Sequence, residues 1–109
     1  MMKTKLSKIP KAPEYLSESS KKLWATLHDD YELDDAARMI LTAGLEARDS
    51  GEKARMMLSK EGMVQVDRFG QRKPHPAVAI QRDCATTLGR CFRLLGMDLA
   101  VASDQRGNR

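Results

Sequence analysis

The stretch LDDAARMILTAGLEARDSGEKARMMLSKEG, residues 33–62, decides the fold of this chain. Asp34 is a typical helix cap that follows the apolar Leu33, and Gly62 is a typical stop signal. The stretch therefore predicts one long helix from Asp35 to about Lys60. When residues are placed about 100° apart, as in a helix, the apolar ones form two neighbouring stripes. The wider stripe holds Ala36, Met39, Ile40, Ala43, Ala47, Ala54, Met57 and Leu58, and the second stripe holds Ala37, Leu41 and Leu45.

Two apolar stripes on one helix are more than a small domain readily covers. The chain has 109 residues, which is enough for one domain with a small core. We therefore predict that the second stripe, Ala37, Leu41 and Leu45, is the contact surface of a homo-oligomer, which we expect to be a closed ring. The alternative is that both stripes are buried by the chain's own helices.

Shorter elements flank the long helix. A first helix is expected to begin after the cap Ser17, to run to about Asp30 and to be anchored by Trp24. Beyond Gly62, residues 62–73 have the pattern of a short hairpin or extended loop that turns at Phe69 and Gly70.

A third helix is expected from Pro76 to about Leu95, since proline suits a first helical position and Gly96 suits a helix end. Its predicted core face consists of Ala77, Ile80, Cys84, Leu88, Cys91 and Leu95. The predicted fold class is mainly α, with three helices, a long central helix and a short hairpin or extended loop before the last helix. We divide the chain into a basic flexible arm (1–12), a helical domain (13–97) and a mobile C-terminal tail (98–109).

The basic residues are concentrated at the two ends of the chain, which has a formal net charge of +4. Residues 1–13 carry four bases and no acid, residues 14–67 seven bases and twelve acids, and residues 68–109 eight bases and three acids. Basic ends favour an anionic partner such as nucleic acid. The alternative reading is a solvated tail and ordinary surface charge.

We predict duplex DNA contacts in two basic groups. The arm contributes Lys3, Lys5, Lys8 and Lys11, and the ordered group consists of Arg68, Arg72, Lys73, Arg82, Arg90 and Arg93. A flexible arm neutralises phosphates without reading sequence, whereas guanidinium groups held on a helix offer bidentate contacts at fixed spacing. The alternative for the helix arginines is pairing with acids of a neighbouring subunit, such as Glu46 or Glu52.

The pattern lacks the residue combinations of catalysis and metal binding. Cys84 and Cys91 would lie about 10 Å apart on one helix, too far for a disulfide, so we expect structural thiols that are buried. His28 and His75 lack the paired spacing of a zinc finger. The sequence has no phosphate-binding glycine loop and no nucleophile and base pair. We therefore expect no enzymatic activity, no metal and no cofactor.

Membrane and export signals are also missing from the sequence. No run approaches the roughly 18 apolar residues of a membrane span, and the N-terminus has no apolar signal-peptide core. We expect a cytoplasmic protein without membrane contact.

The order of several short features resembles that of the P27-type phage terminase small subunits, over residues 10–97. These features are Pro13-x-x-Leu16-Ser17, Trp24 and Leu27, Leu33-x-Asp35, Gly62 with a strand-like segment, His75-Pro76-Ala77, and Leu94-Leu95-Gly96-Met97. The chain departs from the family after Met97. Family members often continue with a proline and an arginine-containing helix, whereas this chain continues with a short tail that has no proline.

This resemblance implies a mostly helical, ring-forming, non-catalytic part of the viral DNA-packaging motor in the bacterial host cell. Such a protein recognises double-stranded viral DNA near the packaging start and presents it to the terminase large subunit, which holds the ATPase and nuclease. Two other classes stay open from the sequence: a small helical DNA-binding regulator and a protein-interaction adaptor.

Overall fold

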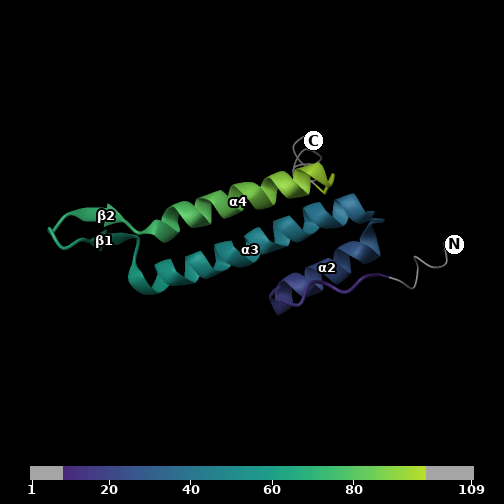
Figure 1. Cartoon of the computed structure of the whole chain (residues 1–109), viewed down its shortest axis with the longest axis horizontal. Coiled ribbons are helices and arrows are strands. Elements are labelled where there is room, and N and C mark those ends of the chain that lie inside the picture. The colour runs from purple at the N-terminus through teal and green to yellow at the C-terminus, as the bar shows by residue number, and fades with distance from the viewer. Residues whose placement is uncertain (1–8, 98–109) are drawn as a thin grey trace, which may run out of the picture.

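The structure, a computed structural model, describes residues 9–97. Within that range it contains three helices, α2 (Glu18–Asp30), α3 (Asp35–Glu61) and α4 (Pro76–Leu94). A two-stranded antiparallel hairpin of β1 (Val64–Val66) and β2 (Arg72–Pro74) lies between α3 and α4 (Figure 1). The predicted fold class is confirmed.

The helices begin and end close to where the local signals predict. The Ser17 hydroxyl accepts a hydrogen bond from the Ser20 amide at 3.1 Å, and the Asp34 carboxylate accepts one from the Ala37 amide at 2.8 Å. These bonds satisfy amides that lack a partner within the first turn of a helix. At the other end of α3, Gly62 adopts a φ of 81°, which residues with a side chain rarely adopt.

The α3 and α4 helices run antiparallel and approach closely along a seam of small residues (Figure 1). A Cβ placed on Gly44 would lie 3.1 Å from Cys91 Cβ, and one placed on Gly51 would lie 3.1 Å from Cys84 Cβ. Both pairs are spaced by seven residues, so the same two-turn repeat brings the helices together twice. The two thiols are free; Cys91 is buried and Cys84 is half-buried.

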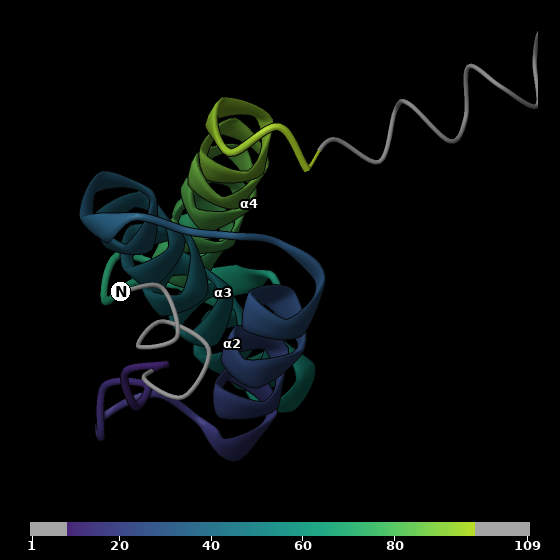
Figure 2. The same ribbon diagram turned by 90° about the vertical axis from the view of Figure 1, so that its right-hand side faces the viewer.

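The main core lies where α2 packs beside the first half of α3 (Figure 2). Its buried residues are Leu16, Trp24, Leu27, Leu41, Leu45 and Met97. Trp24 contributes its whole indole to this core, and its Nε1 donates a hydrogen bond of 2.9 Å to the Pro10 carbonyl.

The predicted roles of the two stripes on α3 need correction. Leu41 and Leu45 are 0% exposed within a single chain, so the prediction that they form a subunit contact is wrong. The segment before α2, α2 itself and the end of α4 cover them. Ala37 is half-buried. The wider stripe is divided, because Ala54 is buried whereas Met39 is 74% exposed.

The prediction of which α4 residues face the core is confirmed only in part. Ala77 and Cys91 are buried, and Cys84, Leu88 and Leu95 are half-buried. Ile80 is exposed, although Ala77 on the same half of α4 is buried.

Candidate nucleic-acid interface

Two groups of basic side chains were predicted to contact DNA, and we name the first group the arm lysines. We divide the second, ordered group into the hairpin bases and the helix arginines. The arm lysines are Lys3, Lys5, Lys8 and Lys11; the hairpin bases are Arg68, Arg72 and Lys73; the helix arginines are Arg82, Arg90 and Arg93. Lys3, Lys5 and Lys8 lie outside the described residues. Lys11 is exposed and follows Pro10, whose carbonyl anchors Trp24.

The hairpin turn is organised by Asp67. Its Oδ1 accepts hydrogen bonds from the amides of Phe69 at 2.8 Å and Gln71 at 2.9 Å, and its Oδ2 lies 3.5 Å from Lys73 Nζ. The hydrogen bond from Gln71, together with those from Phe69 and Lys73, lowers the pKa of this carboxyl although partial desolvation acts in the opposite direction. Gly70 completes the turn with a φ of 80°. The turn is therefore held by side-chain and backbone bonds at once.

The tip of the hairpin presents an aromatic ring among the bases. Phe69 is 74% exposed, and the Arg68 guanidinium carbon lies 5.1 Å from the centre of its ring. Arg72 and Lys73 are exposed on the returning strand. The sequence identified Phe69 only as a turn residue. A large aromatic side chain at a turn flanked by Arg68 and Arg72 was the signal that could have identified it.

His75 joins the base of the hairpin to both long helices. Its Nδ1 accepts a hydrogen bond of 3.0 Å from the Ala77 amide, so the ring proton lies on Nε2, which is 2.7 Å from Glu61 Oε1. Its own amide donates to the Met63 carbonyl at 2.8 Å. The side chain is only 4% exposed. These bonds fix the hairpin relative to the end of α3 and the start of α4.

The helix arginines are all exposed along α4. Arg82 lies 3.5 Å from Asp83, whereas among the described residues Arg90 and Arg93 have no acid within ion-pair distance. Arg82 and Arg93 are separated by about 16 Å along the helix axis. The structure therefore does not gather the hairpin bases and the helix arginines into one patch. It places the helix arginines along α4 and the hairpin bases on the β1–β2 hairpin that precedes α4.

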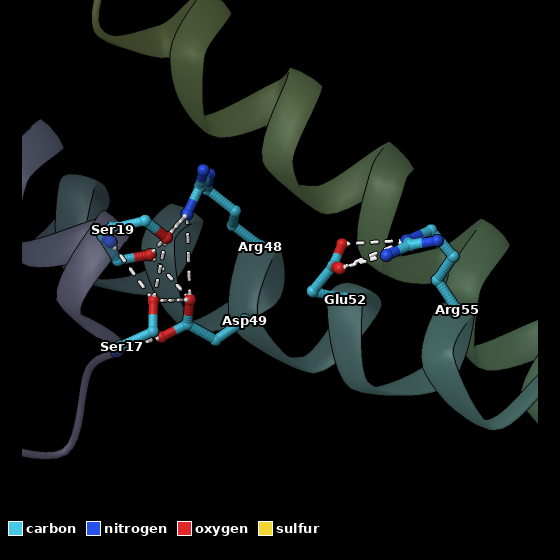
Figure 3. A network of polar contacts seen from close by, with 7 residues as sticks. Ser17, Ser19, Arg48, Asp49, Glu52 and Arg55 are labelled. Carbon is cyan, nitrogen blue, oxygen red and sulfur yellow. Dashed lines mark hydrogen bonds and ion pairs between the residues drawn. The ribbon is translucent and has the colours of Figure 1, made fainter.

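Other bases are engaged inside the chain (Figure 3). Arg48 Nη1 donates to the hydroxyls of Ser19 at 2.9 Å and Ser20 at 3.0 Å. Arg55 forms an ion pair with Glu52 one turn away, and Glu46 accepts a hydrogen bond from the Tyr15 hydroxyl. The two acids considered as partners for the helix arginines thus have partners within their own chain.

Asp49 is the centre of the network that joins α2 to α3 (Figure 3). Its carboxylate accepts hydrogen bonds from the Ser17 amide at 2.8 Å, the Ser17 hydroxyl at 2.7 Å and the Ser20 hydroxyl at 2.6 Å. Desolvation acts to raise the pKa of Asp49, but the hydrogen bonds from Ser20 and Ser17, together with Arg48, hold the pKa below its ordinary value. This network fixes the position of α2.

Two kinds of feature are absent from the described part of the chain. Residues 9–97 contain no group of three or more His, Cys, Asp or Glu side chains placed to hold a metal ion. No helix in that range is both long and apolar enough to cross a membrane.

The fold and its exposed bases define a small helical protein with an extended basic surface. Residues 19–108 match the family described as phage terminase, small subunit, so the chain belongs to that family. Membership indicates a role in phage DNA packaging, in which small subunits are generally the non-catalytic component. The finer assignment to the P27 type stays a prediction. No curated protein and no solved structure matches the chain.

Proposed function

We propose that this protein binds double-stranded viral DNA near the packaging start and presents it to the terminase large subunit, without catalytic activity of its own. The observation that carries the proposal is the series of exposed bases from the hairpin to the end of α4, in a chain of the terminase small subunit family. Arg68, Arg72, Arg90 and Arg93 are the members best suited to phosphate or base contacts, because no described acid lies within ion-pair distance of them.

The arm lysines and the helix arginines have different roles in this proposal. Lysines on an arm neutralise phosphates wherever the duplex runs, so they set affinity and its salt dependence. Arginines spaced along a rigid helix meet the duplex at fixed distances, so they contribute to site preference. The hairpin bases lie before the N-terminal end of α4 and form a second set of proposed contacts beside the helix arginines.

We test the proposal with two variants of equal charge. The test variant reverses Arg82, Arg90 and Arg93 to Glu, and the control variant reverses Lys22, Lys53 and Lys60, three exposed lysines that lie outside both α4 and the hairpin. Affinities for packaging-site DNA and for random duplex are measured together with native mass. The test variant should lose packaging-site affinity more than random-duplex affinity, and more than the control does.

Removal of the arm lysines should change a different quantity. If all four contact phosphates, their deletion lowers the slope of log affinity against log salt by about 0.9 per lost contact. A test variant of unchanged mass and unchanged site preference would contradict the role of the helix arginines. If that variant dissociates before it loses DNA, the arginines form subunit contacts instead.

Homo-oligomer formation remains part of the proposal, but on a different surface. We name the exposed apolar side of α3 the Met39 face, made of Ala36, Met39 and Ala43. These three side chains recur at helical spacing, and small alanines beside a flexible methionine allow close helix packing. The Met39 face replaces Leu41 and Leu45 as the proposed contact with a second copy.

A further inference from the structure

We infer that the β1–β2 hairpin is a DNA wedge, in which Phe69 inserts at a base step from the minor groove while Arg68, Arg72 and Lys73 contact the flanking phosphates. The inference rests on the proposed function, because it requires that the protein bind duplex DNA. It adds a binding mode and a residue, Phe69, that the charge pattern alone does not include.

The exposure of Phe69 is the first argument. A phenyl ring that is 74% exposed leaves apolar surface in water, at a cost of about 25 cal/mol for each Å² that a partner could cover. The Arg68 guanidinium lies against this ring, and Arg72 and Lys73 are exposed on the strand that follows the turn. The nearby acid, Asp67, is engaged in the turn and with Lys73. An apolar ring within a positively charged tip is complementary to a polyanion with stackable bases.

The rigidity of the tip is the second argument. Opening a base step costs a few kcal/mol, so a wedge must be held in place before it meets the DNA. Asp67 binds the amides on both sides of the turn, and Arg68 lies against the ring itself. At the opposite end of the hairpin, His75 connects the strands to Glu61 and Ala77. The position of Phe69 is therefore fixed relative to α3 and α4.

The shape of the hairpin is the third argument. It projects beyond the ends of α3 and α4 (Figure 1), and its two strands are only three residues long each. The minor groove is only about 6 Å wide, so the turn with Phe69 would enter it while the two strands remain outside. Minor-groove proteins with apolar wedges kink DNA toward the major groove and favour flexible pyrimidine–purine steps. The wedge thus supplies site preference without base hydrogen bonds.

A second copy of the chain is the competing occupant of this tip. Val64 and Val66 on β1 are also exposed, so the hairpin offers apolar surface that a second copy could contact. The concentration of bases at the tip favours DNA over a second copy, since two identical tips would bring like charges together. Measurement of native mass without DNA distinguishes these occupants.

The experiment uses the full chain and a duplex of about 30 base pairs with one central TA step in a GC-rich context, beside the same duplex without that step. The test variant is Phe69→Ala, and Phe69→Trp is the conservative variant that keeps a stacking ring. Met63→Ala is the control, because Met63 is exposed at the base of the hairpin rather than at the tip. Affinity, end-to-end energy transfer across the duplex, the fluorescence of 2-aminopurine beside the TA step and native mass are measured for each.

Phe69→Ala should weaken binding to the TA duplex about tenfold, since stacking on an aromatic side chain contributes roughly 1–3 kcal/mol. It should also abolish the duplex bend and the 2-aminopurine signal. Phe69→Trp and Met63→Ala should bind and bend DNA as the wild type does. Circular dichroism should show unchanged helix content in all variants, because the side chain of Phe69 is exposed.

Two results would overturn the wedge while the proposed function stands. In the first, Phe69→Ala binds and bends DNA like the wild type while Arg68→Ala weakens binding, so the hairpin makes only ionic contacts. In the second, Phe69→Ala lowers native mass without DNA, so the tip contacts another copy. A wild-type protein that binds neither duplex would instead refute the proposed function, and the wedge with it.

Discussion

Asp49 shows how a single carboxylate can hold two helices together. It accepts three hydrogen bonds from the first turn of α2 and its cap, and its side chain is only 16% exposed. Its position in the middle of α3 gave no sequence signal, because its partners lie 29 to 32 residues away. Local patterns predict caps that bind within one turn, but they do not predict partners that only the tertiary fold brings near.

Replacement of Asp49 by Ala should lower the free energy of unfolding at neutral pH by about 2 kcal/mol, because hydrogen bonds to a charged group are lost. Since folding lowers the pKa of Asp49, its stabilisation is present above the ordinary value of 3.8 and is lost as the pH falls through the lower pKa of the folded state. The difference between wild type and variant should therefore be full at pH 7 and should decrease below about pH 4.

Urea unfolding at several pH values from 7 to 3 measures this difference. Glu52→Gln is the control, because the pair between Glu52 and Arg55 is more than half exposed and contributes little to stability. A difference between wild type and Asp49→Ala that stays constant across this range would show that the carboxylate charge does not contribute.

At the scale of elements, the helix ends were predictable and the helix faces only partly so. Ser17, Asp34 and Gly62 act through bonds or dihedral angles within one turn, so their sequence signals are nearly sufficient. The face that α3 buries depends on where α2 lies, and two adjacent apolar stripes left that choice open. For the same reason Phe69 could be placed in a turn, while its exposure at a projecting tip could not be predicted.

The seam between α3 and α4 allows a test with three glycines. Alanine normally stabilises a helix by about 1 kcal/mol relative to glycine. At Gly44 and Gly51 the added Cβ would lie 3.1 Å from a cysteine Cβ, so the cysteine on the facing helix must shift by a few tenths of an ångström. At Gly89 the nearest atom is the flexible end of Arg93, 3.7 Å away. Gly44→Ala and Gly51→Ala should therefore destabilise the protein by about 1–3 kcal/mol, whereas Gly89→Ala should stabilise it.

The melting temperatures of the three variants test how closely α3 and α4 pack at these glycines. Adding Cys91→Ala to the Gly44→Ala variant would not relieve the close contact. The atom that meets the new methyl group is the Cβ of residue 91, which alanine has as well as cysteine. Equal stabilisation of all three variants would mean that α3 and α4 are not held at the close distance seen here.

At the scale of the whole molecule, α2 lies beside only one half of the α3–α4 pair, the half that contains the start of α3 and the end of α4 (Figure 1). The other half, where α3 ends and α4 begins, is joined by the hairpin. Apolar side chains in this half, such as Met56, Met57 and Ile80, are exposed. The chain therefore combines a core that it completes by itself with surfaces that it does not cover. The sequence predicted such an excess of apolar surface, but it assigned that excess to the wrong side of α3.

Two double variants of α3 separate the core from the proposed subunit contact. Leu41→Glu with Leu45→Glu places two charges at positions that are 0% exposed, so the chain should unfold. Met39→Glu with Ala43→Glu places the same charges on the Met39 face, where water can solvate them, so helix content and melting temperature should be nearly unchanged. If that face contacts a second copy, this variant should have a lower native mass than the wild type, because like charges would meet across the contact.

Circular dichroism and light scattering at tens of micromolar protein distinguish every outcome. If the Leu41→Glu with Leu45→Glu variant keeps its helix content but loses the oligomer, Leu41 and Leu45 form the subunit contact after all. That result would contradict their burial within one chain. A Met39 and Ala43 variant that keeps the wild-type mass would exclude the Met39 face, and the exposed second half of α3 would be the next surface to change. A wild-type monomer at this concentration would refute the homo-oligomer itself, because a stable ring must form without DNA if these apolar contacts hold it together.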